Sequence, residues 1–449
     1  MDKFKNIIIG FGKAGKTLAK YLAQHDETVL LIERSKQMYG GTCINVGCLP
    51  SKNLIFNGQR GVDFTTAVNK RGEMTRQLRN KNYHMVADEP LATVWDGSAR
   101  FIDNYVLAVV MSDGTTKKVR GERIFINTGA VPNWPSIPGL EFSQRIFTSK
   151  EAMELKKQPK QLAIIGGGYI GLEFAGMFNS FGTHVTIFDQ HTRLLEREDP
   201  DIATEVVADL TDAGIEIKPA TQLTQVKDNG EKVTLYYQQG DQTNTAEFDA
   251  VLVAVGRRPN VSSLGLENTD IALTNRGAIQ VDDHLRTTVQ NIWALGDVNG
   301  GPMFTYVSLD DFRIIIDQLF GKGNRSTADR MVIPTASFLN PPLANVGLNE
   351  RQAKSAGYDL QTFKLSVKAI PKARVLEDQR GLYKVIVDQK THLILGATLY
   401  AAEAHETINL IALAMKAKLP YERLRDMIYT HPTMSEALND LFKTPVVKS

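Results

Sequence analysis

The sequence predicts an α/β fold built on two βαβ units and followed by a separate α+β module. Three observations support this prediction: one strand–turn–helix–strand pattern occurs twice, each copy ends in an acidic residue, and the pattern changes after Pro334. The 449 residues are enough for about three domains of roughly 150 residues each. Hydrophobic residues make up 43% and charged residues 23% of the chain, which is ordinary for a folded protein.

The first copy of the pattern lies near the N-terminus. It consists of an apolar strand, a glycine turn, a helix, a second apolar strand and an acid: residues 7–9, Gly10, Gly12, Gly15, residues 16–24, residues 29–32 and Glu33. The first glycine permits a tight bend, the second lets the backbone approach a pyrophosphate, and the third lets the helix pack on the strand. The N-terminus of the helix would bind the phosphates, and the acid would accept hydrogen bonds from a ribose.

The second copy begins in the middle of the chain. It has the same order of parts: residues 162–165, Gly166, Gly168, Gly171, residues 173–181, residues 185–188 and Asp189. A lone glycine triplet is weak evidence, whereas a complete unit that occurs twice is strong evidence for two dinucleotide sites.

The pattern changes in the last quarter of the chain. Residues 382–387 and 394–399 have the composition of strands, whereas residues 404–416 and 434–441 have the periodicity of helices. These segments predict an α+β module that is separate from the two βαβ units.

The chain has two cysteines, Cys43 and Cys48. A disulfide between them would close a ring of six residues, which would stabilise the fold by only about 2 kcal/mol. The pair is therefore better explained as redox-active or metal-binding. Because no further thiolate or histidine follows at the short spacing of a metal site, we expect no metal centre.

Charge and hydropathy exclude several classes of function. The formal net charge is +2 and no dense basic tract occurs, so neither nucleic acid nor a membrane surface is an expected partner. No apolar stretch approaches the ~18 residues needed to span a bilayer, and the N-terminus lacks the pattern of a secretory leader. We therefore expect a cytoplasmic protein.

The segment 40–52 surrounds the two cysteines and is the most informative in the chain. It resembles the active-site signature of the class I pyridine nucleotide–disulfide oxidoreductases, a family that includes lipoamide dehydrogenase, glutathione reductase and mercuric reductase. The resemblance covers essentially the whole chain and implies a glutathione-reductase-like fold with two Rossmann-like dinucleotide-binding domains and a dimerisation domain. The implied parts are an FAD-binding domain in two pieces, 1–148 and 261–330, an NAD(P)-binding domain, 149–260, and the dimerisation domain, 331–449.

The resemblance also implies the cofactor sites. Residues that match the FAD site are Gly10, Gly12, Gly15, Glu33, Gly41, Thr42, Lys52, Thr128, Gly129 and Asp297. Residues that match the nicotinamide site are Gly166, Gly168, Gly171, Asp189 and Gly256. An acid at position 189 would repel the 2′-phosphate of NADPH, so NADH is favoured. The nearby Arg193 could soften that preference and leaves NADPH open.

The family resemblance implies a division of labour between the cysteines. Reduced nicotinamide gives hydride to the flavin, Cys48 receives the electrons from the flavin, and Cys43 exchanges with the substrate as a thiolate. Lys52 and Glu173 match a pair beside the reactive edge of the flavin. Arg257 and Arg258 could be surface charges and receive no role.

A histidine and a glutamate near the C-terminus match the acid–base dyad of the family. His431 would exchange a proton with the Cys43 thiol across a homodimer interface, and Glu436 would orient the imidazole. Thr433 and Glu436 also have the spacing of a helix capping box, so a structural role for Glu436 stays open. A carboxylate has two oxygens and could serve both roles.

The substrate side leaves several alternatives. Mercuric reductases carry a further cysteine pair at the C-terminus, which residues 442–449 lack, and glutathione reductases prefer a basic residue at position 189. Four segments resemble the bacterial reactive-chlorine-resistance flavoproteins of the RclA type: 78–84, 304–311, 324–327 and 370–375. That resemblance implies reduction of a small oxidant, hypothiocyanous acid, in oxidative-stress defence. Dihydrolipoamide dehydrogenase, a copper(II) or mercuric-type metal reductase, and a redox sensor remain alternatives.

Overall fold

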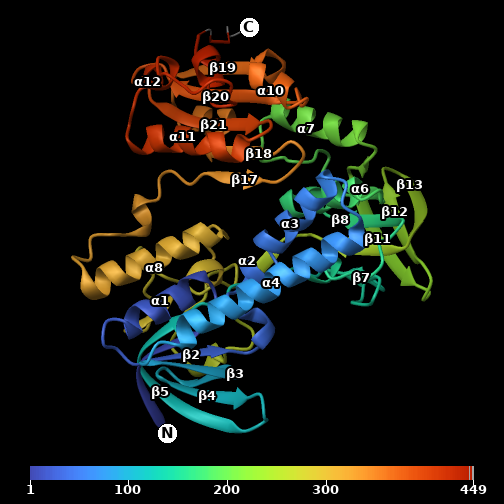
Figure 1. Cartoon of the computed structure of the whole chain (residues 1–449). Helices are drawn as coiled ribbons and strands as arrows, with labels where there is room; N and C mark the ends of the chain where they lie inside the picture. The colour runs from blue at the N-terminus through green and yellow to red at the C-terminus, as the bar shows by residue number, and fades with distance from the viewer. Residues whose placement is uncertain (444, 447–449) are drawn as a thin grey trace. The chain divides into compact units, whose positions relative to one another are not determined.

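The computed structural model describes residues 1–443 and 445–446, and these fall into two compact units. Unit 1 comprises Met1–Trp134, Thr148–Lys157 and Val255–Asp329. Unit 2 comprises Pro135–Phe147, Gln158–Ala254 and the segment from Arg330 onward. Figure 1 follows the chain by colour through both units. The predicted α/β class with a C-terminal α+β module is confirmed. The division into four parts stays a prediction, and the tail 442–449 lies partly outside the described residues.

Unit 1 is built on a mixed six-stranded sheet. Its strands are β1 (Asp2–Ile9), β2 (Val29–Glu33), β3 (Ala92–Asp103), β4 (Val106–Met111), β5 (Thr116–Ile126) and β16 (Ile292–Ala294). Strand β1 is parallel to β2 and to β5, whereas β3, β4 and β5 form an antiparallel meander. Strands β6 (Ala130–Pro132) and β15 (Arg257–Pro259) form a second small sheet. The parallel strands place the first glycine turn at the carboxyl end of β1.

The helices of unit 1 cover this sheet and hold the cysteines. They are α1 (Lys13–Ala23), α2 (Thr42–Asn45), α3 (Cys48–Gln59), α4 (Phe64–Ala87), α5 (Ser149–Ala152) and α8 (Thr305–Phe320). Helix α1 begins directly after Gly12, earlier than the predicted residue 16, because that glycine already serves as its N-cap. The buried face of α1 packs against α4 and α8. This packing brings the first glycine turn and the cysteine segment into one compact layer.

The first part of unit 2 is a parallel sheet that contains the second glycine turn. Its strand order is β10 (Glu216–Lys218), β9 (His184–Phe188), β8 (Gln161–Ile165), β14 (Ala250–Val253) and β7 (Ile146–Phe147). Helices α6 (Tyr169–Ser180) and α7 (Pro200–Asp212) follow β8 and β9, and a three-stranded sheet of β11 (Thr221–Asp228), β12 (Val233–Gln239) and β13 (Gln242–Phe248) follows β10.

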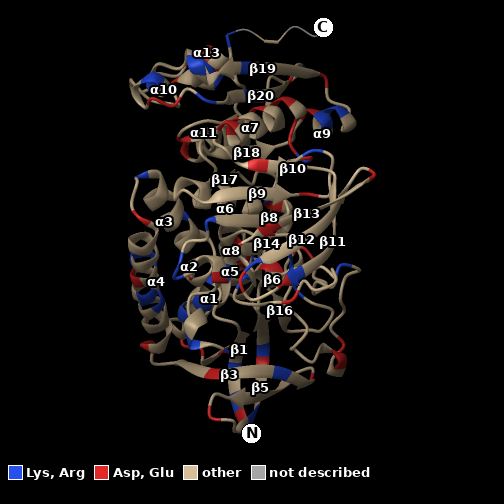
Figure 2. Ribbon diagram, turned by 90° about the vertical axis from the view of Figure 1, so that its right-hand side faces the viewer, with Lys and Arg blue, Asp and Glu red and all other residues tan. Residues whose placement is uncertain are grey.

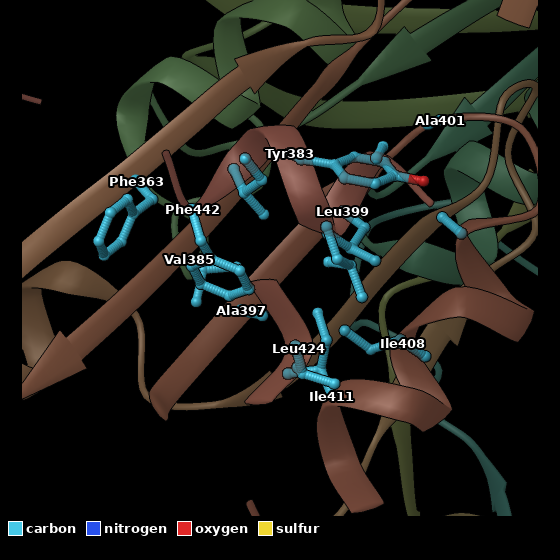
Figure 3. Close-up of a cluster of buried hydrophobic side chains, with 14 of the residues drawn as sticks. Phe363, Tyr383, Val385, Ala397, Leu399, Ala401, Ile408, Ile411, Leu424 and Phe442 are labelled. Atoms are coloured by element: carbon cyan, nitrogen blue, oxygen red, sulfur yellow. The ribbon is translucent and has the colours of Figure 1, made fainter. Parts of the chain in front are cut away.

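The last part of unit 2 is an antiparallel five-stranded sheet. Its strand order is β17 (Thr335–Ser337), β18 (Leu343–Gly347), β21 (Ile394–Tyr400), β20 (Leu382–Asp388) and β19 (Leu360–Ser366). The helices are α9 (Glu350–Ser355), α10 (Pro371–Val375), α11 (Ala404–Lys416), α12 (Glu422–Arg425) and α13 (Ala437–Leu441). Helix α11 packs on β18 and β21 over the core shown in Figure 3, where Phe363, Tyr383 and Leu399 are fully buried.

Two further features bear on the expected partners. Acidic and basic residues are interspersed over the ribbon in Figure 2, in keeping with the formal net charge of +2. Among the described residues, no helix combines the length and the hydropathy that crossing a bilayer requires.

Candidate functional site

The first glycine turn closes around the end of β5. Gly10 has a φ of +104°, and a Cβ there would lie 2.4 Å from the carbonyl oxygen of Asn127, so only glycine fits. A Cβ on Gly15 would lie 2.6 Å from the carbonyl oxygen of Gly10. Asn127 holds the turn in place: its Oδ1 accepts from the N–H of Gly15 at 2.9 Å, and its Nδ2 donates to the Leu295 carbonyl at 2.6 Å. Asn127 was not predicted from the sequence, because its partners lie far from it in the chain.

Glu33 ends β2 beside this turn, as predicted. Its side chain is buried, and its two oxygens accept from the backbone N–H groups of Phe11 at 3.0 Å and Ser35 at 3.1 Å. Burial raises the pKa of Glu33, although these two N–H groups act in the opposite direction. Each carboxylate oxygen has a lone pair left for a ribose hydroxyl.

The geometry of the first glycine turn fits a dinucleotide. The space that a Cβ on Gly10, Gly12 or Gly15 would fill is taken by backbone or by the Asn127 side chain, so the backbone is tightly closed. Gly41, with a φ of +80°, also approaches closely, since a Cβ there would lie 2.8 Å from the Cα of Gly12. The N-terminus of the 11-residue helix α1 follows directly. These features suit the pyrophosphate of FAD.

The second glycine turn repeats this geometry in unit 2. Gly166 has a φ of +105°, and a Cβ on Gly171 would lie 2.0 Å from the Gly166 carbonyl oxygen. Asp189 directly follows β9, and its Oδ2 accepts from the Gly167 N–H at 2.6 Å while its Oδ1 lies 2.6 Å from Nδ1 of His191. Gly168 caps α6. The turn fits a second dinucleotide, and His191 is a neighbour of Asp189 that the sequence analysis did not single out.

The remaining predicted nicotinamide residue, Gly256, lies in unit 1, whereas Gly166, Gly168, Gly171 and Asp189 lie in unit 2. Its carbonyl oxygen accepts from the N–H of Asn133 at 2.9 Å.

The segment around Thr128 and Gly129 is pinned to the chain near Asn260. The Thr128 hydroxyl donates to the Asn260 carbonyl at 2.8 Å, and the Asn260 N–H donates to the Gly129 carbonyl at 2.9 Å. These two bonds fix the place where β6 and β15 meet within unit 1.

The two cysteines lie at adjacent helix starts. Cys43 is the second residue of α2 and is half-buried, whereas Cys48 is the first residue of α3 and is exposed. Both are free thiols in this structure, and they hydrogen-bond to each other. The hydrogen bond from Cys48 is the main cause that lowers the pKa of Cys43 to about 6, and the same bond raises the pKa of Cys48 well above its usual range. These opposite directions favour the thiolate on Cys43 over the thiolate on Cys48.

Helix α8 contributes a hydroxyl to this pair. The Oγ1 of Thr305, the first residue of α8, lies 3.8 Å from the Sγ of Cys48, and its hydrogen bonding also lowers the pKa of Cys43. The neighbouring Tyr306 stacks on Phe304 with ring centroids 5.1 Å apart, and burial raises the pKa of Tyr306 to about 12. Thr305 and Tyr306 belong to a segment that was singled out in the sequence, but without an individual role.

The charge of Arg257 interacts both with Asp297 and with Cys48. Asp297 lies on the short helix Gly296–Asn299, and burial raises its pKa while the charge of Arg257 lowers it. The Nη2 of Arg257 donates to the Ala130 carbonyl at 2.6 Å, and its charge also interacts with Cys48. The interpretation of Arg257 as a surface charge missed this placement, whereas Arg258 is exposed.

Lys52 and Glu173 fall on different units. Lys52 lies on α3 in unit 1, and Glu173 lies buried on α6 in unit 2, where its Oε1 accepts from the Phe338 N–H at 2.8 Å. Their pairing beside a flavin stays a prediction.

The C-terminal dyad is formed within one chain. Nδ1 of His431 lies 2.9 Å from Oε2 of Glu436, and the Thr433 N–H donates to the other oxygen, Oε1, at 3.0 Å. Burial opposes ionisation of Glu436, but the His431 and Thr433 hydrogen bonds lower its pKa overall. The Glu436 N–H donates back to the Thr433 hydroxyl at 3.2 Å, so α13 begins at Ala437 and later than the predicted residue 434. Glu436 both orients the imidazole and closes the turn.

The side chain of His431 is 69% exposed. Its Nδ1 is held by Glu436, which fixes the orientation of the imidazole. Among the described residues, no cluster of three or more His, Cys, Asp or Glu side chains could hold a metal ion.

Comparisons with known proteins define the class. The model of the pyridine nucleotide–disulphide oxidoreductases matches residues 4–311, and the model of their dimerisation domain matches residues 333–442. The chain therefore belongs to the pyridine nucleotide–disulphide oxidoreductase family, as the resemblance implied, and is a flavoprotein disulfide oxidoreductase. The family depends on FAD and NAD(P)H.

Particular relatives narrow this class. The chain is 48% identical over 442 residues to the probable pyridine nucleotide-disulfide oxidoreductase RclA of Escherichia coli (strain K12). The alignment covers 98% of this chain and 99% of that protein. It is 34% identical to a mercuric reductase of Lysinibacillus sphaericus over 97% of this chain and 82% of that protein. The solved Cu(II) complex of the HOCl-induced flavoprotein disulfide reductase RclA from Escherichia coli superposes with a TM-score of 0.95, covering 98% of this chain and 99% of that chain.

Proposed function

We propose that the protein reduces a small oxidant, hypothiocyanous acid, with electrons from NADH, and so protects a cell against reactive chlorine and thiocyanate oxidants. The observation that supports this proposal is the pair of free thiols at the adjacent starts of α2 and α3, in which hydrogen bonding lowers the pKa of Cys43 and raises that of Cys48. The similarity to RclA of Escherichia coli supports the same substrate class, because that relative is an HOCl-induced flavoprotein disulfide reductase.

The cysteines would perform the reduction in two steps. The Cys43 thiolate attacks the electrophilic sulfur of hypothiocyanous acid, the S–O bond breaks, and the leaving oxygen takes up a proton and departs as water. Cys48 loses its proton and attacks the Cys43 sulfur, which forms the disulfide and releases thiocyanate. Because the chain has no third cysteine, the electrons leave from Cys43 directly.

The cofactors and the dyad supply the rest. Gly10, Gly12, Gly15 and Glu33 would hold FAD, which would supply the hydride chemistry that connects NADH with the disulfide. His431 of the partner subunit would supply the proton that the leaving oxygen needs, and Glu436 would hold the imidazole so that Nε2 faces the thiol. This arrangement requires a homodimer, in agreement with the matched dimerisation domain.

A substrate panel tests the proposal. We expect the FAD-loaded protein to consume NADH rapidly with hypothiocyanous acid, and Cys43→Ser and Cys48→Ser each to lower turnover by at least roughly 10³-fold, because each serine removes one sulfur of the disulfide. Turnover would be followed by NADH absorbance, with flavin absorbance as the control for cofactor loading. Equal turnover by the Cys43→Ser variant would refute the thiol mechanism.

The same panel separates the alternatives. Dihydrolipoamide, copper(II) and mercury(II) would be measured beside hypothiocyanous acid. Robust dihydrolipoamide oxidation without oxidant reduction would identify a dihydrolipoyl dehydrogenase, the name of a relative that is 33% identical. Stoichiometric metal binding without repeated turnover would identify a redox sensor, and repeated turnover with metal alone would identify a metal reductase.

The nicotinamide preference rests on Asp189. We expect a lower KM for NADH than for NADPH. Asp189→Asn should reduce the ratio of the KM for NADPH to the KM for NADH about tenfold, which corresponds to a loss of about 1.4 kcal/mol in discrimination between the two nucleotides. Asp241→Asn, an exposed acid in the turn between β12 and β13, is the matched control. A lower KM for NADPH in the wild-type enzyme would overturn this assignment.

A further inference from the structure

Lys16 is a buried lysine in the first glycine turn for which the mechanism above has no use. It lies on α1 directly after Gly15, and only 4% of its surface is exposed. Its Nζ donates to the carbonyl oxygen of Gly40 at 3.2 Å and to Oδ1 of Asn82. Gly40 begins the segment that leads into α2, three residues before Cys43. Lys16 thus ties α1 to the backbone that presents the reactive thiol.

The second partner of Lys16 is itself held in place. Asn82 lies on α4, and its Nδ2 donates to the Leu78 carbonyl one turn earlier at 2.6 Å, which leaves Oδ1 directed at the ammonium. Helices α1 and α2 both pack against α4 (Figure 1). The ammonium group is therefore fixed from three sides, by α1, by the loop before α2 and by α4.

No carboxylate in the described part of the chain is a partner of Lys16. Both oxygens that accept from its Nζ belong to neutral groups, and within the described residues no acidic side chain forms an ion pair with it. Burial, assisted by the charge of Lys13, lowers the pKa of Lys16 to about 8, while the negative charge of Cys43 acts in the opposite direction. Leaving a buried cation without an acidic partner is unfavourable, and a nearby negative charge offsets that cost. The negative charge that interacts with Lys16 is that of Cys43, which lies three residues after the Gly40 carbonyl that Lys16 holds.

We propose that Lys16 is a positioning residue. It holds the segment from Gly40 to Cys43 through the Gly40 carbonyl, and its buried charge stabilises the Cys43 thiolate. This proposal rests on the proposed function in one respect, that Cys43 is the thiol that exchanges with substrate. A lysine near a cysteine favours the thiolate, and the effect is stronger where water is excluded. The charge is supplied by the same chain, so the thiolate does not depend on the partner's His431 alone.

The other groups around the two sulfurs act differently. Cys48, Thr305 and the backbone N–H of Leu49 lower the pKa of Cys43 through hydrogen bonds, whereas Lys16 lowers it through charge. The charges of Lys52 and Arg257, and the phenol of Tyr306, interact with Cys48. Removing Lys16 should therefore change Cys43 selectively.

Alkylation of the NADH-reduced holoenzyme by iodoacetamide measures this effect without any oxidant. In wild type, the alkylation of Cys43 should rise with a midpoint near pH 6. In Lys16→Met and Lys16→Gln, we expect the midpoint to rise by about one pH unit and the rate at acidic pH to fall about tenfold. Lys20→Met is the matched control, since Lys20 lies one turn further along α1 and half-buried; its midpoint should equal that of wild type.

A second variant leaves Lys16 in place. Asn82→Asp is nearly isosteric and puts a carboxylate against the ammonium, so it should cancel the charge felt by Cys43 and raise the midpoint as well. If both Lys16 variants lose FAD, the result with Asn82→Asp decides. An unchanged midpoint in every FAD-loaded variant at these two positions would overturn the role of Lys16.

The sites of alkylation, mapped on peptides, separate this proposal from the one on function. Modification of Cys48 in place of Cys43 would contradict the assignment of the exchanging thiol. Modification of Cys43 with a midpoint that ignores Lys16 would contradict only the present inference.

Discussion

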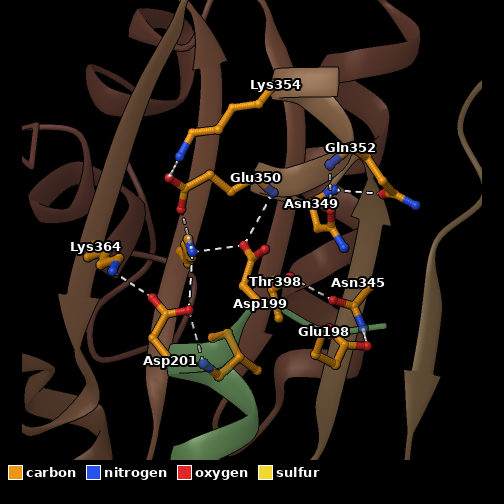
Figure 4. A network of polar contacts seen from close by, with 12 residues as sticks. Glu198, Asp199, Asp201, Asn345, Asn349, Glu350, Gln352, Lys354, Lys364 and Thr398 are labelled. Carbon is orange, nitrogen blue, oxygen red and sulfur yellow. Dashed lines mark hydrogen bonds and ion pairs between the residues drawn. The ribbon is translucent and has the colours of Figure 1, made fainter. Parts of the chain in front are cut away.

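Two lysines are buried among the residues that the structure describes, one in each unit, and their surroundings are opposite. Lys16 donates to a backbone carbonyl and an amide oxygen, both neutral. Lys384 on β20 lies among three carboxylates: its Nζ is 2.7 Å from Asp199, 3.1 Å from Asp201 and 2.9 Å from Glu350. Figure 4 shows the three carboxylates converging: Asp201 lies in α7, Asp199 directly before α7, and Glu350 in α9.

The pKa values of the two lysines shift in opposite directions. Burial lowers the pKa of Lys16 to about 8. Burial also acts to lower the pKa of Lys384, but hydrogen bonds to Asp199 and Glu350 outweigh it and raise the pKa overall. Burial by itself therefore does not define the role of a lysine. A buried ammonium surrounded by carboxylates stabilises a fold, whereas one without them is available to stabilise an anion formed during a reaction.

The cluster around Lys384 joins two parts of unit 2. Asp199 and Asp201 lie at the start of α7, which belongs to the parallel-sheet part, whereas Lys384 and Glu350 lie in the antiparallel-sheet part. Other polar contacts run parallel to it: the Tyr400 hydroxyl donates to Asp209 at 2.8 Å, Asn345 donates to Glu198 at 3.2 Å, and Asn349 donates to the Arg197 carbonyl at 2.7 Å. The cluster is thus a structural link within this unit.

The largest effect that separates the two lysines should be on stability. Lys384→Met leaves three carboxylates without their buried cation, so we expect unfolding to become easier by about 3–5 kcal/mol. Lys16→Met removes a buried charge that had no acidic partner, and its free energy of unfolding should differ from wild type by less than about 1 kcal/mol. Guanidinium denaturation of the two variants, followed by circular dichroism, measures both. Equal losses would remove the distinction between the two sites.

A surface lysine of the same cluster provides the control. Lys364 contacts Asp201 at 2.5 Å from a side chain that is 33% exposed. Because solvent screens this pair, Lys364→Met should cost only about 0–1 kcal/mol. A loss as large as that of Lys384→Met would show that burial of the cation is not the decisive property.

The fold was largely predictable because its determinants are local. The glycines at positions 10 and 166 have positive φ angles that only glycine adopts without strain, and the apolar runs beside them form the expected strands. The predicted strands 382–387 and 394–399 agree with β20 and β21 to within one residue. The start of α13 was wrong by three residues, because side-chain bonds between Thr433 and Glu436 hold a turn where the periodicity predicts a helix.

The surroundings of the site were less predictable because they depend on contacts distant in sequence. Asn127 closes the first glycine turn across 112 positions, and Lys16 meets Asn82 across 66. In the sequence, Lys16 is one basic residue among several in an amphipathic helix, and nothing local shows that it points inward. Position 172, the counterpart of Lys16 in the second copy, is a buried leucine, so a comparison of the two copies could have drawn attention to Lys16.

The smallest effect that sharpens the comparison is at low pH. The pKa values of Asp201 and Glu350 are both lowered. For Asp201, burial acts to raise the pKa, but Lys364 and Lys384 outweigh it. For Glu350, hydrogen bonds from Lys354 and Lys384 lower the pKa. A lowered folded-state pKa gives stability that is present above the unfolded value of about 4 and is lost as the pH falls through the folded value.

Asp201→Asn should therefore be less stable than wild type at pH 6, and the difference should shrink as the pH falls toward 3. The raised pKa of Lys384 contributes nothing to this change, because its stability is fully present below the unfolded lysine value of about 10.4. Denaturant midpoints measured between pH 3 and pH 6 test the expectation, and a difference that stays constant over this range would contradict it. Lys16→Met should show no such trend in that window, since neither it nor Lys16 titrates there.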